Sequence, residues 1–388
     1  MAKLIDITGK ALSGEWGTDD ESGDGIPVLR TTNFTNEGVV NYNDVVTRTI
    51  TKKNIDEKFL RKGDIIIEKS GGSDKFPVGR VIYFDGDENT YLFNNFTGLL
   101  RVKDQDAWYP RYVFYSLFAN YKRGGTRAFE NKTTGLHNLK TDDYVSRYEV
   151  AETDKAEQIS ICDKLDRLYG IIKSREKELQ LLDDLIKARF VEMMESTELS
   201  DETSIENITE RVKVGFVGTC EKFYTDELGV PMLRTGNITE NGIDLSDLKY
   251  VTEEFHEKNK KSQIHEGDLL IARHGSNGQA NVYTGPEAQC LNAVVIVPNE
   301  DIACSVFLAG LINSPTVKAQ IEKTLVGSTQ HVVNTKSIAS LKVKIPNLTV
   351  QKQYCDFVHQ VDKSKVAVQK ALDEAQMLFD SLMQKYFG

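Results

Sequence analysis

The chain has 388 residues, of which 40% are hydrophobic, and a formal net charge of −10. This length suggests two or three domains, and the hydrophobic share suffices for packed cores, which excludes wholesale disorder. No run approaches 18 apolar residues and the first residues do not resemble a signal peptide, so we expect neither a membrane span nor secretion. The five cysteines are scattered and form no Cys-x-x-Cys pair, which predicts a cytoplasmic protein without disulfides.

The acidic net charge argues weakly against a nucleic-acid partner, but the charge is unevenly distributed. Residues 1–150 carry 21 Lys and Arg against 22 Asp and Glu, and residues 204–348 carry 14 against 17. Most of the acidic excess therefore lies in residues 151–203 and 349–388. A local basic face remains compatible with the two nearly neutral segments.

Residues 4–150 read as a domain of mixed helices and strands. A turn at Gly25 leads into a short strand, and Gly63-Asp64 precedes a buried strand at residues 65–67. Residues 109–120 have the pattern of an amphipathic helix, and a polar loop follows over residues 127–138.

Residues 154–195 contain no proline and predict a helix roughly 60 Å long. Asp154 and Glu157 have the spacing of a capping box at its start. Apolar residues recur at steps of three and four, which is typical of a narrow seam facing a partner helix. These seam positions are Leu165, Leu168, Ile172, Leu179, Leu182 and Ile186.

The pattern of the first domain then recurs. Residues 25–33 (GIPVLRTTN) match 229–237 (GVPMLRTGN), and residues 63–67 match 267–271, both at an offset of 204. Asn94 matches Asn292 at an offset of 198, a drift that insertions in surface loops produce. So many blocks in one order indicate an internal duplication.

A second helix with the same heptad spacing follows the second domain. Its seam residues include Val361, Val368, Leu372, Phe379 and Leu382. We expect domains at residues 1–152 and 199–348 and helices at 153–198 and 349–388. The fold class is therefore α+β, with two similar domains and an antiparallel intramolecular coiled coil related by a pseudo-two-fold axis. A less favoured alternative packs each helix on its own domain.

The sequence contains no recognisable catalytic or metal-binding motif. It has no GxGxxG or GxxxxGK[ST] loop and no HExxH pair among its six histidines. Asp64 with Glu68 and Lys69 superficially resembles a nuclease cluster, but the ExK spacing is missing. We therefore interpret Asp64 as a turn residue and expect a chain without catalytic or metal sites.

Each copy does carry three polar loops of the composition that reaches DNA bases and phosphates. The candidate DNA-binding residues of the first copy are Arg30, Thr32, Asn33, Lys69, Ser70, Ser73, Lys75, Arg127, Lys132, Thr133 and His137. Those of the second copy are Arg234, Thr235, Asn237, Arg273, His274, Ser276, Asn277, Gln279, Thr329, Gln330 and His331. The strand cores GDIII and GDLLI are similar, whereas the loops after them differ. Similar scaffolds with different tips predict two recognition modules for two different targets.

This organisation resembles the specificity subunit of type I restriction–modification systems. The resemblance rests on the duplicated GIPVLRTTN and GDIII blocks and on Gln158 and Gln353 near the helix starts, and it covers essentially the whole chain. Pro346, before the second helix, has no counterpart in the first copy.

The resemblance implies a non-catalytic DNA-binding subunit with two target recognition domains. Each domain would read half of an interrupted, asymmetric DNA sequence, and the helix pair would set the spacing between the halves. The implied partners are double-stranded DNA, two modification (adenine methyltransferase) subunits that bind S-adenosylmethionine, and restriction subunits that use ATP and Mg. No cofactor is expected in this chain.

Two alternatives remain open at this point. The chain could be the recognition module of another methyltransferase–nuclease system. It could also be a coiled-coil scaffold whose duplicated domains bind protein or carbohydrate. Neither the target bases nor the spacer length follows from the sequence.

Overall fold

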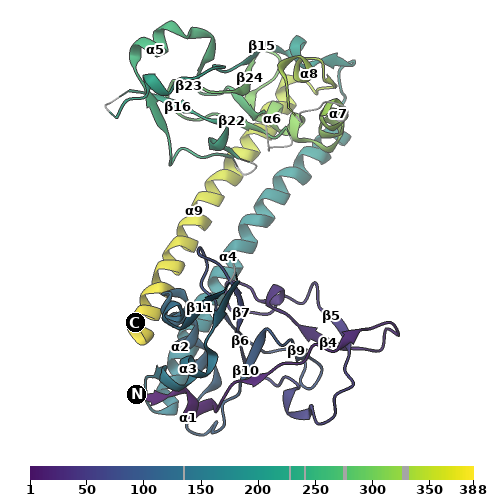
Figure 1. The fold of residues 1–388 in the computed structure, drawn as a ribbon. Helices are drawn as coiled ribbons and strands as arrows, with labels where there is room; N and C mark the ends of the chain where they lie inside the picture. Colours follow the sequence, from purple (N-terminus) through teal and green to yellow (C-terminus); the bar gives the residue numbers. More distant parts are fainter. Residues whose placement is uncertain (134–135, 227–228, 240–241, 274–277, 326–331) are drawn as a thin grey trace. The chain divides into compact units, whose positions relative to one another are not determined.

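The computed structural model describes residues 1–133, 136–226, 229–239, 242–273, 278–325 and 332–388. The chain forms two compact units (Figure 1). Unit 1 comprises residues 1–176 and 370–388, and unit 2 comprises residues 177–369. Each unit thus combines one copy of the duplicated domain with part of each long helix.

Unit 1 contains two four-stranded sheets. The first has the antiparallel order β2 (Leu12–Ser13), β10 (Thr97–Leu100), β6 (Ile65–Glu68), β8 (Val81–Tyr83). The second has the order β3 (Thr18–Asp19), β5 (Val46–Thr49), β4 (Ile26–Leu29), β9 (Leu92–Phe93).

The predicted strand at residues 65–67 is confirmed, and the structure explains why it is apolar throughout. Side chains alternate across a strand, so Ile65 and Ile67 pack in the cluster that contains α2 (Pro110–Lys122). Ile66 points the other way, into the cluster formed with Leu29 and Phe93 of the second sheet. Because both faces of the strand are buried, residues 65–67 are all apolar.

Unit 2 repeats this arrangement. Its first sheet has the order β15 (Thr209–Val214), β24 (Ala293–Pro298), β21 (Leu269–Ala272), β22 (Ala280–Val282). Its second has the order β19 (Lys249–Val251), β16 (Val230–Leu233), β23 (Ala288–Cys290), β20 (Gln263–Ile264). The helices α6 (Ser305–Asn313) and α7 (Pro315–Leu325) follow.

The remaining elements are short. In unit 1 they are β1 (Ala2–Lys3), α1 (Leu4–Thr8), η1 (Thr31–Asn33), η2 (Asp56–Lys58), β7 (Ser70–Gly72), η3 (Gly125–Phe129), β11 (Glu130–Thr133), β12 (Leu136–Leu139), α3 (Thr141–Arg147) and β13 (Glu149–Val150). In unit 2 they are β14 (Thr203–Ser204), η4 (Ile205–Ile208), η5 (Glu221–Phe223), η6 (Thr235–Asn237), β17 (Ile238–Thr239), β18 (Gly242–Ile243), α5 (Glu253–Lys258), η7 (Lys260–Ser262), α8 (Thr335–Ala339) and β25 (Lys342–Val343).

The sheet registers confirm the duplication and correct one match. The parallel pair β4–β9 aligns Leu29 with Phe93, and the parallel pair β16–β23 aligns Leu233 with Cys290. The next amide along donates to the equivalent carbonyl in both units, Asn94 to Leu29 and Leu291 to Leu233. The predicted match of Asn94 with Asn292 is therefore wrong by one residue. Because the offset between the two copies changes along the chain, this one-residue error could not be detected from the sequence.

The two predicted long helices are α4 (Lys155–Ser196) and α9 (Leu348–Phe387), both unbroken in Figure 1. The Glu157 amide donates to Asp154 Oδ1 at 2.9 Å, as expected of a helix cap. In unit 1, Leu165 near the start of α4 shares a core cluster with Phe379 near the end of α9. In unit 2, Phe190 near the end of α4 contacts Tyr354 near the start of α9. The helices are therefore antiparallel partners, as predicted.

All eleven predicted seam residues are buried or half-buried. Lys365 is a polar residue between the seam positions Val361 and Val368 of α9, and it pairs with Asp183 of α4, with Nζ 2.6 Å from Oδ1. Each helix also packs on its domain, because the same clusters contain residues of α2 or α6. The alternative in which the helices pack only on their own domains is therefore wrong.

A buried glutamine joins each domain to the helix that follows it. Gln158 Oε1 accepts from the Tyr109 amide at 2.8 Å, and its Nε2 donates to the carbonyls of Ala107 and Thr153. In unit 2, Gln351 makes the equivalent three bonds. The partner of Gln158 is thus Gln351 and not the exposed Gln353, so the predicted match is wrong by two residues.

The same bonds identify the counterpart of Pro346. Gln351 Nε2 donates to the Pro346 carbonyl, in the way that Gln158 Nε2 donates to that of Thr153. Pro346 therefore corresponds to Thr153. The register of the two helix starts could not be chosen from sequence, because residues 351–353 (QKQ) offer two glutamines.

Candidate nucleic-acid interface

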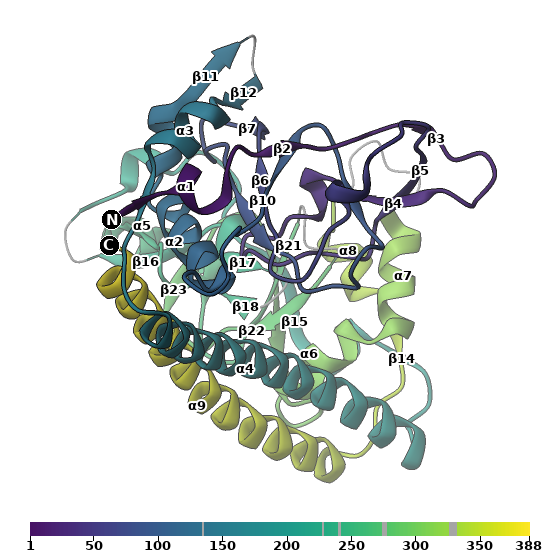
Figure 2. The ribbon, with the colours of Figure 1, turned by 90° about the horizontal axis from the view of Figure 1, so that it is seen from below.

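Two of the three predicted loops of unit 1 form one small sheet. Strand β12 pairs with both β11 and β7, with Asn138 opposite Ser70 and His137 opposite Gly72 (Figure 2). The Leu139 amide also donates to the Lys69 carbonyl at 2.8 Å. We call the sheet β7–β12–β11 the ribbon of unit 1. It brings residues 69–75 and 127–138, far apart in sequence, to one place.

The third loop of unit 1 is attached by Arg80, which the sequence prediction missed. Arg80 Nη2 donates to the Thr31 carbonyl at 3.0 Å, and Nη1 donates to the Phe34 carbonyl at 2.9 Å. Its counter-ion is Glu68, the last residue of β6. The pKa of Glu68 is raised, because the effect of burial exceeds the opposing effect of Arg80. No sequence motif marks this pair, because Glu68 and Arg80 meet only through sheet pairing.

Unit 2 shows the same convergence in its described part. The Val333 amide donates to the Arg273 carbonyl at 3.0 Å, which repeats the Leu139–Lys69 bond of unit 1. Arg273 Nη1 is held by Asn292 Oδ1 at 2.8 Å. Asn281 of β22 donates to the Thr239 carbonyl at 2.9 Å and so connects the third loop.

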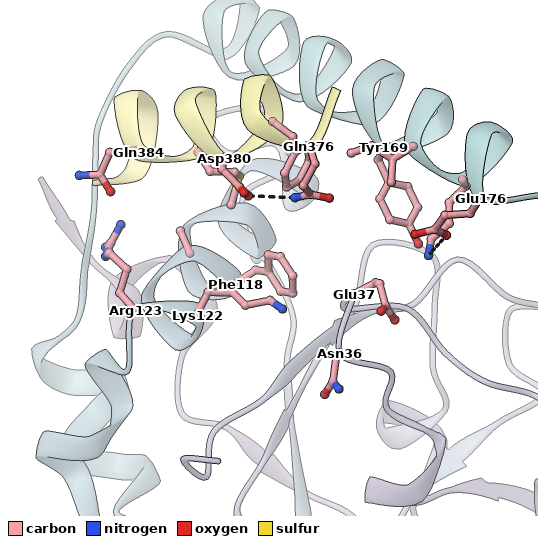
Figure 3. A pocket seen from close by; sticks show the side chains of 15 residues that line it. Asn36, Glu37, Phe118, Lys122, Arg123, Tyr169, Glu176, Gln376, Asp380 and Gln384 are labelled. Atoms are coloured by element: carbon pink, nitrogen blue, oxygen red, sulfur yellow. Dashed lines mark hydrogen bonds and ion pairs between the residues drawn. The ribbon is translucent and has the colours of Figure 1, made fainter. Parts of the chain in front are cut away.

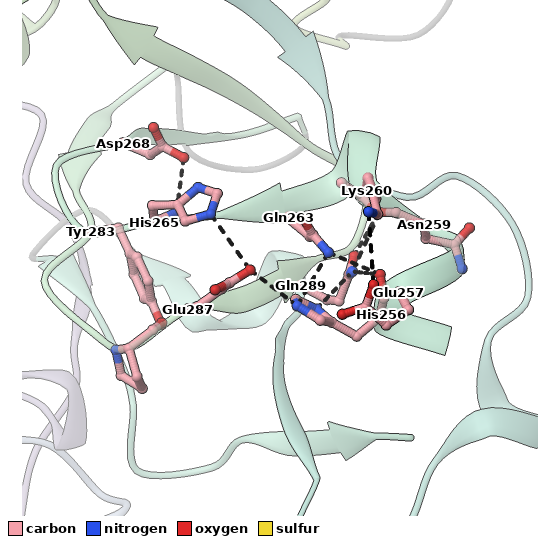
Figure 4. Close-up of polar contacts among 12 residues, drawn as sticks. His256, Glu257, Asn259, Lys260, Gln263, His265, Asp268, Tyr283, Glu287 and Gln289 are labelled. Atoms are coloured by element: carbon pink, nitrogen blue, oxygen red, sulfur yellow. Dashed lines mark hydrogen bonds and ion pairs between the residues drawn. The ribbon is translucent and has the colours of Figure 1, made fainter. Parts of the chain in front are cut away.

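A polar network supports the strand that leads to Asn292 (Figure 4). Gln289 Nε2, on β23, lies 3.1 Å from His256 Nδ1, while His256 Nε2 lies 3.1 Å from Glu287 Oε1. Gln263 Nε2 also lies 3.2 Å from His256 Nε2, so an amide donor faces each nitrogen of the imidazole ring. Leu92 takes the place of Gln289 in unit 1. This polar support for β23 is thus specific to unit 2.

Several predicted DNA-binding residues lie where the structure supports no further statement. His274, Ser276, Asn277, Thr329, Gln330 and His331 lie outside the described residues. Lys132 and Thr133 belong to β11, but only their backbone is described.

Asn33 and Asn237 do not reach the surface, contrary to the prediction. They are 1% and 3% exposed. Asn33 Oδ1 accepts from the Arg30 amide at 2.8 Å, and its Nδ2 donates to the carbonyls of Asn41 and Asp44. Asn237 makes the equivalent bonds in unit 2. These amides hold their turns together and have no group left for DNA.

Arg30 and Arg234 are partly committed to the same turns. Arg30 Nη2 pairs with Asp44 at 3.0 Å, and Arg234 Nη2 pairs with Asp247 at 2.9 Å. Beside them, Thr32 is exposed and Thr235 is half-buried. The repeated RTxN sequence thus encodes a turn geometry in which the x position, Thr32 in unit 1 and Gly236 in unit 2, is exposed.

His137 is also a structural residue. It is buried, with Nδ1 3.1 Å from Glu130 Oε2 and Nε2 3.6 Å from Asp74 Oδ1. These contacts join β12, β11 and the loop after β7, so the imidazole fixes the ribbon instead of reaching outward.

The exposed polar residues of the unit 1 interface are Ser73, Lys75 and Arg127, with Ser70 and Lys69 half-buried. Lys69 Nζ donates to Ser13 Oγ at 3.0 Å. Burial lowers the pKa of Lys69, and nearby Lys58 adds to this effect. In unit 2, Gln279 is half-buried. Both interfaces carry cations and hydrogen-bonding groups suited to phosphates and base edges.

The described residues offer no sign of catalytic chemistry. Asp64 is buried and accepts two hydrogen bonds from Arg101, at 2.7 and 2.6 Å, which supports its interpretation as a structural residue. Among these residues no group of three or more His, Cys, Asp or Glu is placed to hold a metal ion. All five cysteines are buried free thiols. Within the same part of the chain, every helix is too short or too polar to cross a membrane.

Unit 1 also contains a pocket of about 470 Å³ between α2, α4 and α9 (Figure 3). Its apolar lining includes Phe118, Ile172 and Phe379. Polar groups surround this lining, among them Lys122 and Asp380, and they form no acid–base or nucleophilic constellation. We assign it no chemical role.

The fold defines a class of protein: a duplicated α+β scaffold whose copies, each with a candidate interface, are joined by an antiparallel helix pair. The chain belongs to the type I restriction modification DNA specificity domain family, whose model matches residues 2–183 and 212–375. This membership decides against the carbohydrate- or protein-binding scaffold.

Individual relatives agree with this assignment. The chain is 21% identical over 356 residues to the type I restriction enzyme EcoBI specificity subunit of Escherichia coli, covering 80% of this chain and 73% of that protein. It is 24% identical over 199 residues to the putative type I restriction enzyme MjaX specificity subunit of Methanocaldococcus jannaschii, covering 49% and 46%.

Two solved structures share the fold. The type I restriction–modification S subunit from M. genitalium has a TM-score of 0.62 at 16% identity, covering 100% of this chain and 95% of that chain. A chain from a study of complex assembly and conformational transition in the type I R-M system has a TM-score of 0.56 at 12% identity, covering 100% and 96%.

Proposed function

We propose that unit 1 and unit 2 each read one half of an interrupted, asymmetric DNA target. One observation carries the proposal: in each unit, loops distant in sequence are drawn together on an equivalent scaffold, as the Leu139–Lys69 and Val333–Arg273 bonds show. Equivalent scaffolds suit two separate short sequences. Their different tips, EKSGGSDK and ARHGSNGQ, suit two different sequences.

The residues that we retain as DNA contacts are candidate-loop residues whose side chains are exposed or half-buried. In unit 1 they are Thr32, Lys69, Ser70, Ser73, Lys75 and Arg127. In unit 2 they include Thr235, Arg273 and Gln279. The fixed guanidinium of Arg273 suits the paired acceptors of a guanine edge.

The helix pair acts in this proposal as a spacer. It carries no candidate DNA-binding residue, and its seam is paired along both helices, down to the Lys365–Asp183 contact. A paired helix resists bending better than a loop does. The length of the pair would therefore set how many base pairs lie between the two half-sites.

Catalysis would belong to partner subunits. We propose that two modification subunits, which bind S-adenosylmethionine and methylate adenine, dock on the outer faces of the helices. There Leu181, Leu185 and Val366 are exposed although they are large and apolar. Restriction subunits that use ATP and Mg would join this complex, and the chain would act in the cytoplasm.

Methylome sequencing tests the proposed function. The chain is expressed with its modification subunit in a host that lacks other adenine methylation. We expect one interrupted motif with two different halves. In a second strain, residues 1–150 of this chain are replaced by the corresponding segment of another specificity subunit. There only one half of the methylated motif should change. A continuous motif, or a change in both halves, would refute the two-reader proposal.

A further inference from the structure

Phe76 is an exposed aromatic residue at the interface of unit 1 that the candidate loops did not include. Its side chain is 53% exposed, in the loop between β7 and β8. Lys75 precedes it, with Nζ 5.3 Å from the ring centroid. The exposed ring lies among the polar and charged side chains of the candidate loops, where it offers an apolar surface to a bound ligand.

The turn that carries Phe76 is held in place. The Ser73 amide donates to the Phe76 carbonyl at 2.7 Å, and the Phe76 amide donates to Ser73 Oγ at 3.2 Å. Arg127 Nη2 donates to the carbonyls of Asp74 and Lys75, at 3.2 and 3.4 Å. The ring is therefore presented by a closed turn fixed to η3, close to the ribbon.

We propose that Phe76 is a specificity-determining residue whose ring contacts the 5-methyl group of a thymine in the half-site read by unit 1. The proposal rests on the proposed function. It follows from the chemistry of the major groove, where the thymine methyl is the apolar group among base-edge donors and acceptors. That groove also admits a narrow β-ribbon such as β11–β12, whereas apolar wedges that unstack bases enter the minor groove.

The location of Phe76 supports a role in specificity. It follows residues 68–75, whose sequence differs between the two copies, directly after the similar GDIII and GDLLI strands. A contact common to both half-sites would be expected in a segment that the two copies share. A contact made in one half-site alone belongs in a segment that differs.

The experiment uses the complex of this chain with its modification subunits, after the target has been read by methylome sequencing. Each thymine of the target is replaced in turn by deoxyuridine, which lacks the 5-methyl group. We expect one position in one half-site at which the wild-type methylation rate falls about four-fold, the value of one buried methyl group. Phe76→Ala should lower the rate on the thymine substrate similarly and remove the deoxyuridine effect.

Matched controls come from the same molecule and the same DNA. Phe96, in the turn before β10, is 54% exposed, and Phe96→Ala should retain the deoxyuridine effect. Phe76→Leu should retain part of it. Deoxyuridine effects in the other half-site should be the same in wild type and Phe76→Ala, and thermal unfolding should show that the variants fold.

Three results would overturn the inference. The first is a deoxyuridine effect that persists in Phe76→Ala. The second is that no thymine in the half-site read by unit 1 shows a deoxyuridine effect with the wild-type protein. The third is fluorescence of 2-aminopurine that rises on binding and depends on Phe76, which would indicate a wedge between bases. Failure of the proposed function itself would appear earlier, as the lack of a two-part motif in the methylome.

Discussion

The spacer role of the helices can be tested by lengthening both by one heptad. Residues 173–179 are duplicated after Leu179 in α4, and residues 362–368 are duplicated after Val368 in α9. A heptad returns the seam to nearly the same face of each helix, within about 20°. Both insertions fall on the same side of the Asp183–Lys365 ion pair, which therefore stays in register.

The rise of the helix sets the magnitude. Seven residues add about 10 Å to each helix, and one base pair occupies about 3.4 Å, so the ceiling is about three added base pairs. DNA turns by roughly 34° per added base pair, whereas the lengthened helix pair turns far less. This difference in rotation opposes the addition of all three base pairs to the spacer. We therefore expect a spacer lengthened by one to three base pairs.

Methylome sequencing measures this directly, because the motif reports both half-sites and the interval between them. The half-sites should remain unchanged, since no interface residue is altered. The control variant has the heptad in α4 alone, which leaves seven residues without a partner in α9 and should strongly reduce methylation. A paired insertion that methylates the original motif, with its original interval, would refute the spacer role.

Three further predictions concern single residues. Gln158→Ala and Gln351→Ala each remove three buried hydrogen bonds and should destabilise the protein by about 3 kcal/mol in denaturant unfolding. Asn33→Ala should lower the unfolding temperature without changing the methylated motif, because the amide serves its turn. Arg273→Gln should relax recognition in one half-site, at a cost of about 1–3 kcal/mol in binding to the original sequence.

Each of these predictions has a control variant or an outcome that would contradict it. Gln353→Ala, two residues from Gln351 but exposed, should change stability by less than about 0.5 kcal/mol. A new motif in Asn33→Ala would show that the amide does contact DNA. For Arg273→Gln, equal weakening on all sequences would indicate a phosphate contact instead of a base contact.

The periodic features of this protein were predictable from sequence because each repeats a physical requirement. The heptads of α4 and α9 and the apolar strand at residues 65–67 must recur wherever the same packing recurs, and the duplication displayed each twice. The matches that failed, Asn94 with Asn292 and Gln158 with Gln353, lie where loop lengths differ. In such segments the sequence alone does not fix which residues of the two copies correspond, and the hydrogen bonds of the structure do.

The candidate interface was predictable in composition but not in orientation. Asn33 and His137 are polar loop residues by sequence, yet both point inward, because a tight turn and a ribbon need internal hydrogen-bonding partners. Arg80 escaped notice because its partners, Glu68 and Thr31, are near it only through folding. Phe76 has a chemical type that predicts burial, so its exposure could be learned only from the structure.

Unit 1 is assembled from both ends of the chain, and this has a consequence for its synthesis. Phe387 stacks on Tyr115 and contacts Tyr112, with ring centroids 6.5 and 5.1 Å apart, and its carbonyl accepts from Arg123. The core of the first domain therefore stays incomplete until the last turn of α9 leaves the ribosome, although proteins usually complete their N-terminal domains first. A chain released early lacks part of the first domain as well as the end of the second helix. Without the last turn of α9, Tyr112 and Tyr115 lose their contacts with Phe387.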